Sequence, residues 1–116
     1  MKNSDSITIT VGSAKFTAHI EDSETGRAFL AKLPITLNMS ELHDNEKYYY
    51  GDPLPTKAKY YDTINPGDLM LYGNDCIVLF YGSAGGYSYT PIGTLTDTTG
   101  LAKALGSGKV DVTFSK

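Results

Sequence analysis

The sequence contains no tryptophan, one cysteine and no long apolar run. Because a single cysteine cannot form a bridge within the chain, a disulfide-built secreted scaffold is excluded. No apolar stretch approaches the roughly 20 residues that span a bilayer, so we expect no membrane-spanning segment. The ten lysines and arginines are scattered, and the formal net charge is -3. Phosphate binding needs clustered cations, which argues against nucleic acid as a partner.

The chain length and the N-terminal segment bound the organisation of the protein. The 116 residues fit a single domain over residues 1–116, and 41% of them are hydrophobic, enough for one core. Residues 1–6 are polar and lack the apolar centre of a signal peptide. We therefore expect a cytoplasmic protein, or an exported one if a leader has been removed. We also expect a monomer or a weak dimer, and no cofactor.

Apolar and polar residues alternate in several short segments, which is the pattern of half-buried β-strands. The first two segments, residues 6–11 and 14–20, are joined by a glycine-containing turn and predict a hairpin. Residues 76–81 are almost continuously apolar, which indicates a strand buried on both faces. The other predicted strands are residues 35–39, 46–50, 68–72, 87–95 and 110–114.

Two short helices are predicted between these strands. The first covers residues 25–33, with Asp22 or Ser23 as its N-cap and a proline directly after it. The second begins after a cap at Thr98 or Thr99 and stops at a glycine. Many short antiparallel strands with two isolated helices predict a mainly β protein. A closed β-barrel is the favoured architecture, because closure removes the exposed strand edges.

Five segments, taken together and in order, resemble the small bacterial cyclophilin-like proteins, and they cover nearly the whole chain. The resemblance implies a closed cyclophilin-like β-barrel with two short helices capping its open ends. The segments are LPITLNMS (33–40), NEKYYY (45–50), PGDLMLYGNDCIVLFY (66–81), YSYTPIG (87–93) and LGSGKVDVTF (105–114).

The resemblance does not extend to the catalytic arginine of authentic cyclophilins, which lies on a barrel strand beside an aromatic and apolar proline pocket. The only arginine of this chain, Arg27, falls in the first predicted helix. Lys47, Lys57 and Lys59 are the nearest cationic substitutes, and lysine is a poor copy of a planar guanidinium. We therefore expect a protein that binds a peptide or small ligand without efficient prolyl isomerase activity. The alternatives are a divergent peptidyl-prolyl isomerase and a structural or interaction module.

Nine tyrosines form the most distinctive feature of the composition. Any one of them can simply occupy a strand position, since tyrosine is a good strand former. As a set they favour a binding surface, because each ring offers a large apolar face and a hydroxyl group. The alternation of the strands predicts that Met39, Tyr48, Phe80 and Tyr89 form the wall of a ligand pocket.

Two other groups of residues carry potential chemistry. Glu41, His43, Asp44 and Glu46 are metal-ligating types, but their spacing matches no calcium loop. We expect them to form a solvated polar loop, and we predict no metal site. Cys76 begins an apolar strand without a histidine near it in sequence. It is expected to be a buried hydrophobic residue rather than a nucleophile.

Overall fold

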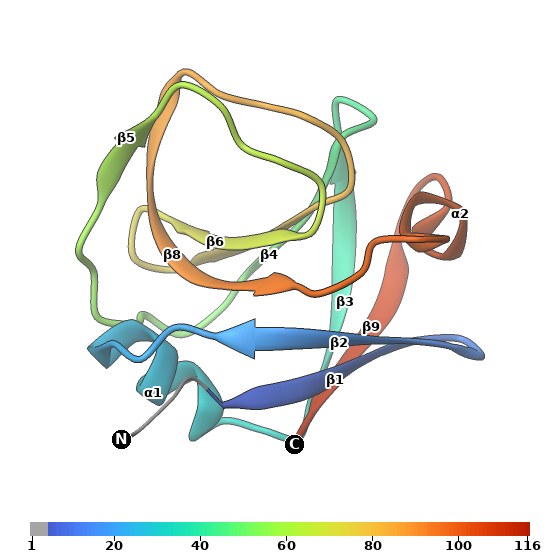
Figure 1. Cartoon of the computed structure of the whole chain (residues 1–116), viewed down its shortest axis with the longest axis horizontal. Helices are drawn as coiled ribbons and strands as arrows, with labels where there is room; N and C mark the ends of the chain where they lie inside the picture. Colours follow the sequence, from blue (N-terminus) through green and yellow to red (C-terminus); the bar gives the residue numbers. More distant parts are fainter. Residues whose placement is uncertain (1–4) are drawn as a thin grey trace.

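Eight antiparallel strands close into a barrel in the computed structural model, which describes residues 5–116 (Figure 1). The order of these strands around the ring is β2-β1-β9-β3-β4-β7-β6-β8. A further strand, β5, lies outside the ring and pairs with β8. The elements in chain order are β1 (Ser6–Val11), β2 (Ala14–Ile20), α1 (Glu24–Leu30), β3 (Ile35–Leu42), β4 (Glu46–Tyr50), β5 (Lys59–Tyr61), β6 (Asp68–Tyr72), β7 (Cys76–Phe80), β8 (Tyr87–Leu95), α2 (Leu101–Leu105) and β9 (Val110–Ser115).

The barrel closes where β2 pairs with the C-terminal half of β8. In this seam Ile20 lies opposite Gly93 and His19 lies opposite Thr94. A Cβ atom at Gly93 would lie 2.4 Å from the backbone oxygen of His19. The absence of a side chain at this position therefore allows the two strands to approach, and the seam depends on it.

The interior of the barrel is filled by apolar side chains from the strands around the ring. Ile9, Leu37, Leu79 and Phe114 are fully buried in this core. From α1, Phe29 packs against Phe114 at a ring-centroid distance of 5.4 Å in an edge-to-face arrangement. Apolar side chains of the barrel's own strands and of α1 therefore occupy its interior.

Both helices are shorter than the sequence predicts. The first, α1, ends at Leu30 rather than at residue 33, and the Ser23 side chain caps it by accepting a hydrogen bond from the Gly26 backbone. The second, α2, has Gly100 at its N-cap position with no side-chain cap, so the predicted threonine cap is wrong. The leucines at both ends of α2 are buried in the barrel core, and this burial holds the short helix in place.

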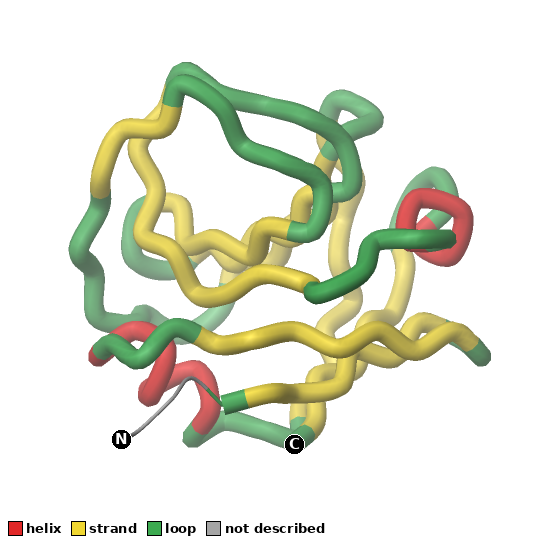
Figure 2. The backbone as a smooth tube through the Cα atoms, in the orientation of Figure 1, coloured by secondary structure: helices red, strands yellow, loops and turns green. Residues whose placement is uncertain are grey.

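The outer face of the barrel carries a second apolar layer over β7. All residues of β7 are buried, as its continuous apolar sequence predicts. Ile77 belongs to the barrel core, whereas Val78 belongs to a separate outer cluster. Two long loops run side by side over this region, joined by a bridge between Ile64 and Ala84 (Figure 2). The side chains of Ile64 and Ala84 pack in the outer cluster, so the loops cover part of the outer face.

Candidate functional site

A cavity of about 400 Å³ opens beside the outer apolar cluster, over β4, β7, β6 and β8. Its volume falls within the range of small-molecule sites. Five of the nine tyrosines line it. The lining residues are Leu42, His43, Glu46, Tyr48, Tyr50, Tyr72, Cys76, Val78, Tyr87 and Tyr89.

Strand register explains how residues far apart in sequence come together here. Tyr50 lies opposite Cys76 on β7, and Cys76 lies opposite Tyr72 on β6. On the same face of β4, Tyr48 lies opposite Val78 of β7. At the start of β4, Glu46 lies opposite the buried Phe80 of β7. Alternate side chains of a strand share one face, so Glu46, Tyr48 and Tyr50 project together from β4.

The aromatic rings of the site contact one another in tilted or edge-to-face geometry. Tyr72 and Tyr89 lie 5.4 Å apart between ring centroids, and Tyr48 and Tyr50 lie 5.8 Å apart. Tyr89 also meets Phe80 edge-to-face at 5.6 Å. Tyr50 remains 64% exposed and Tyr89 only 5%. The site therefore has a fixed aromatic base and an exposed aromatic rim.

The four residues predicted to form the pocket wall have three different positions in the structure. Tyr48 and Tyr89 line the cavity. Phe80 lies behind Tyr89 in the outer cluster and does not line the cavity. Met39 is fully buried in the barrel core, on the other side of the wall. Alternation alone placed Met39 on an apolar face, but that face points into the barrel.

Glu46 is an acidic side chain at the edge of this aromatic site, and only 9% of the residue is exposed. Burial raises the pKa of its carboxyl above the usual 4.5, while attraction to His43 lowers it and repulsion from Glu41 raises it further. Glu46 takes part in no ion pair within the described residues. The ion pairs within the described residues are Arg27–Asp22, Lys32–Asp52 and Lys47–Glu41.

We predict that Glu46→Gln increases the thermal stability of the protein by a few degrees at neutral pH. A folded-state pKa above the unfolded value means that the ionised carboxylate opposes folding. This cost is present above the folded-state pKa and disappears as the pH falls toward 4.5 and below. The stability difference between the variant and the wild type should therefore shrink on acidification, measured by thermal unfolding from pH 8 to pH 4. A variant that is less stable than the wild type at pH 8 would contradict this.

Glu41 is separated from Glu46 by the wall of the barrel and has a different role. Lys47, fully buried on the interior side of β4, pairs with the Glu41 carboxylate at 2.8 Å. The hydroxyl of Tyr81 donates a second hydrogen bond to that carboxylate at 2.6 Å. Burial opposes ionisation of Glu41, but the contacts with Lys47 and Tyr81 outweigh it and lower its pKa. The predicted solvated loop is therefore wrong for Glu41, which belongs to β3, and Glu46, in the predicted strand β4, is buried rather than solvated.

The turn between β3 and β4 contains the other two residues of the predicted polar loop. His43 and Asp44 are both exposed and both adopt positive φ angles, 55° and 56°. The imidazole of His43 lines the rim of the cavity. Within residues 5–116, no group of three or more histidine, cysteine or acidic side chains has an arrangement that could hold a metal ion.

Cys76 lies on the floor of the cavity and is 4% exposed. Burial raises the pKa of its thiol to about 11, so the sulfur is protonated at neutral pH. Burial also raises the pKa of Tyr89 to about 12. Both groups are therefore neutral and act as apolar surface with a weak or moderate hydrogen-bond donor.

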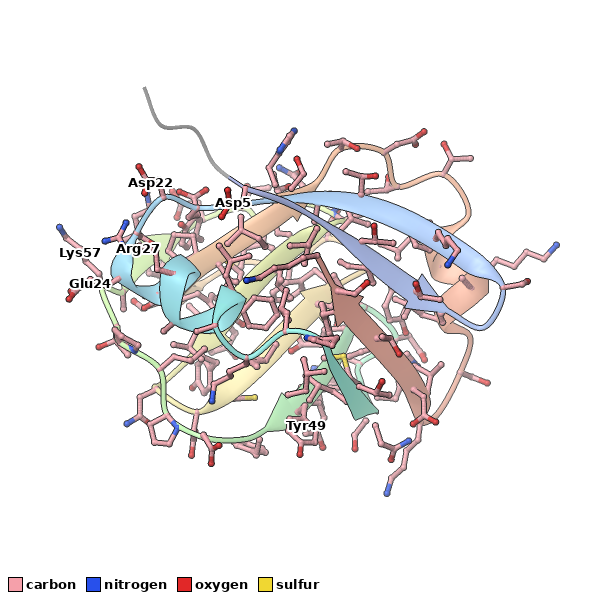
Figure 3. The ribbon with its side chains drawn as sticks, turned by 90° about the horizontal axis from the view of Figure 1, so that it is seen from below. Asp5, Asp22, Glu24, Arg27, Tyr49 and Lys57 are labelled. Atoms are coloured by element: carbon pink, nitrogen blue, oxygen red, sulfur yellow. The ribbon has the colours of Figure 1, made fainter. Side chains whose placement is uncertain are left out.

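The arginine and the exposed lysines lie outside the cavity. Arg27 projects from α1 at one corner of the molecule, where it pairs with Asp22 at 2.8 Å (Figure 3). Lys57 lies at the same corner (Figure 3). The ammonium group of Lys59 lies 5.6 Å from the ring centroid of Tyr61, on β5. None of these three residues lines the cavity.

Several lining residues were not among the predicted wall residues. Glu46 and Tyr50 carried a usable signal, because they alternate with Tyr48 on one strand. Tyr72 and Tyr87 join the site only through cross-strand pairing, which the sequence does not specify. No helix in the described part of the chain is long and apolar enough to cross a membrane.

The fold and the site define a closed antiparallel β-barrel protein with an aromatic cavity on the outside of its wall. The model of the cyclophilin-like family matches residues 9–115, nearly the whole chain. The protein therefore belongs to the cyclophilin-like family. No curated protein matches the chain.

Proposed function

We propose that this protein binds a peptide or small ligand in the tyrosine-lined cavity, without efficient prolyl isomerase activity. The observation that carries the proposal is the cavity itself, where five tyrosines from the three strands β4, β6 and β8 surround one opening. Proteins rarely expose large contiguous apolar patches unless these contact a partner. Tyr50, Tyr72 and Tyr87 are exposed at its rim.

The dimensions of the site suit a short extended segment as well as a small molecule. Glu46 and Tyr50 lie four residues apart on β4, a distance of roughly 13 Å at about 3.3 Å per residue. A peptide of about four extended residues has the same length. The rings can cover the apolar parts of such a ligand, and their hydroxyl groups can bond its polar atoms.

Binding can be measured through the tyrosines, because the chain has no tryptophan. With ring-¹³C-labelled tyrosine, NMR titrations with acetylated tetrapeptides centred on proline, leucine or lysine should shift the signals of the cavity tyrosines. Tyr50→Ala should weaken the binding of a responding peptide about tenfold, since a buried aromatic contact contributes about 1–2 kcal/mol. Tyr60→Ala is the matched control, because Tyr60 is 61% exposed but lies outside the cavity. Equal loss in both variants, or no shift with any ligand at millimolar concentration, would refute the proposal.

Isomerase activity is tested separately. We predict that an Ala-Pro peptide bond relaxes between cis and trans over tens to hundreds of seconds with or without the protein at micromolar concentration. The physical reason is that no guanidinium reaches the cavity, since Arg27 is held on α1 by Asp22. NMR exchange spectroscopy on the peptide gives the rate. A protein-dependent acceleration that survives Arg27→Lys would favour a divergent isomerase that uses another donor.

A further inference from the structure

Glu46 and the tyrosines around it combine a carboxylate with aromatic faces. A neutral ligand would contact the aromatic faces and leave the carboxylate without a charged partner. A buried carboxylate is costly unless a cation or hydrogen-bond donors compensate it. Among the described residues Glu46 belongs to none of the ion pairs, and no hydrogen bond lowers the pKa of its carboxyl group. Its cross-strand neighbours are Leu42 and Phe80, which carry no charge that could neutralise it.

The five tyrosines supply the complementary part of a cation site. The face of an aromatic ring attracts a cation, and several rings together form the cages that hold substituted ammonium groups. Tyr48 and Tyr50 project from β4, while Tyr72 and Tyr89 stand on the opposite side of Cys76 and Val78. Cys76 and Tyr89 keep their protons at neutral pH. The carboxylate of Glu46 is therefore the charged group that the strands contribute to the cavity lining.

We propose that the ligand of this cavity carries an organic cation, an alkylated ammonium or a guanidinium, which is enclosed by the tyrosine rings and paired with Glu46. This inference rests on the proposed binding function and specifies its ligand class. The same chemistry is found in a free quaternary ammonium compound and in a lysine or arginine side chain of a peptide. In both cases the apolar carbons next to the charge contact the rings, while the charge approaches the carboxylate.

His43 is the cavity residue whose attraction lowers the pKa of Glu46. It stands on the exposed turn between β3 and β4, and no ion pair joins it to Glu46 within the described residues. The imidazole therefore leaves the carboxylate accessible to a ligand from the cavity side. Glu41, the other charge near Glu46, is already paired with Lys47.

Pairs of ligands with the same shape and different charge test this inference. Choline is compared with 3,3-dimethylbutan-1-ol, and an acetylated Ala-Ala-Lys-Ala amide with its norleucine counterpart, by NMR titration of the labelled tyrosines. We expect at least one cation to bind about tenfold more tightly than its neutral counterpart, since the cation–π contacts and the charged pair both favour the charged ligand. The choline pair and the peptide pair distinguish a small-molecule ligand from a peptide side chain.

Glu46→Gln should reduce the affinity for the cation severalfold, because the charged pair is lost while the cation–π contacts remain, and binding of the neutral counterpart should stay unchanged. Glu21→Gln is the matched control, because Glu21 is exposed and lies outside the cavity. Thermal unfolding of Glu46→Gln, which we expect to be more stable than the wild type, distinguishes loss of binding from loss of folding. Equal binding of the charged and neutral ligands would overturn the cation inference and leave the binding function intact. Absence of binding by all four ligands would overturn the inference and also count against the proposed function.

Discussion

Lys47→Met is expected to lower the free energy of unfolding by about 3–5 kcal/mol, the range observed when one partner of a buried ion pair is removed. The Lys47 side chain is fully buried, and its ammonium group donates to the backbone oxygens of Gly106 and Gly108 as well as to Glu41. Methionine has a similar length but no donor. It would therefore leave two carbonyl groups and the Glu41 carboxylate without their partner.

Urea unfolding followed by circular dichroism measures this loss. Lys59→Met is the control, because the Lys59 side chain is exposed and lies over the ring of Tyr61, so it should cost less than about 1 kcal/mol. The double variant Lys47→Met/Glu41→Gln should recover part of the loss, since the uncompensated charge is gone. A single variant that loses less than 1 kcal/mol would show that the buried network contributes little to stability.

The pH dependence of this network follows from the lowered pKa of Glu41. A depressed folded-state pKa stabilises the fold above the unfolded value of 4.5, and this stabilisation is lost as the pH falls through the folded-state value. Glu46 acts in the opposite sense, because its pKa is raised. The two carboxylates on opposite sides of the barrel wall therefore partly cancel in the acid unfolding of the wild type.

Gly93→Ala is expected to destabilise the protein by about 3 kcal/mol, at the upper end of the overpacking range. The new Cβ atom would lie 2.4 Å from the His19 backbone oxygen and 2.9 Å from the Cδ1 atom of Ile20. Side-chain rotation cannot relieve a clash with a backbone oxygen. The two strands must therefore separate at the seam where β2 meets β8.

Hydrogen exchange shows where this separation occurs. The amides of Glu21 and Thr96 bond across the seam to Ile92 and Thr17, and they should exchange faster in Gly93→Ala than amides of the β3–β9 pairing. Gly12→Ala is the control, since a Cβ atom there meets open space and costs only about 1 kcal/mol for its left-handed backbone. Uniform acceleration across the barrel would mean that the seam has no separate role.

Local sequence patterns were sufficient for most of the secondary structure. The alternation in residues 6–20 predicted the first hairpin, and the predicted strands at Glu46–Tyr50, Asp68–Tyr72 and Tyr87–Leu95 have the observed ends. These patterns work because a strand shows its buried face in every second residue. The cap of α2 was mispredicted, because burial of its leucines rather than a side-chain cap fixes where that helix begins.

The sequence by itself determined that the protein is mainly β, with many short strands, two short helices and an excess of tyrosine. These features follow from periodicity and composition. Only the tertiary structure decided that Met39 faces the packed interior while Tyr48 faces the outer cavity. It also decided that Lys47 meets the 106–108 turn and that Tyr72 and Tyr87 join Glu46. These relations depend on strand register and on which side of the wall encloses the core, and a period of two leaves both undetermined.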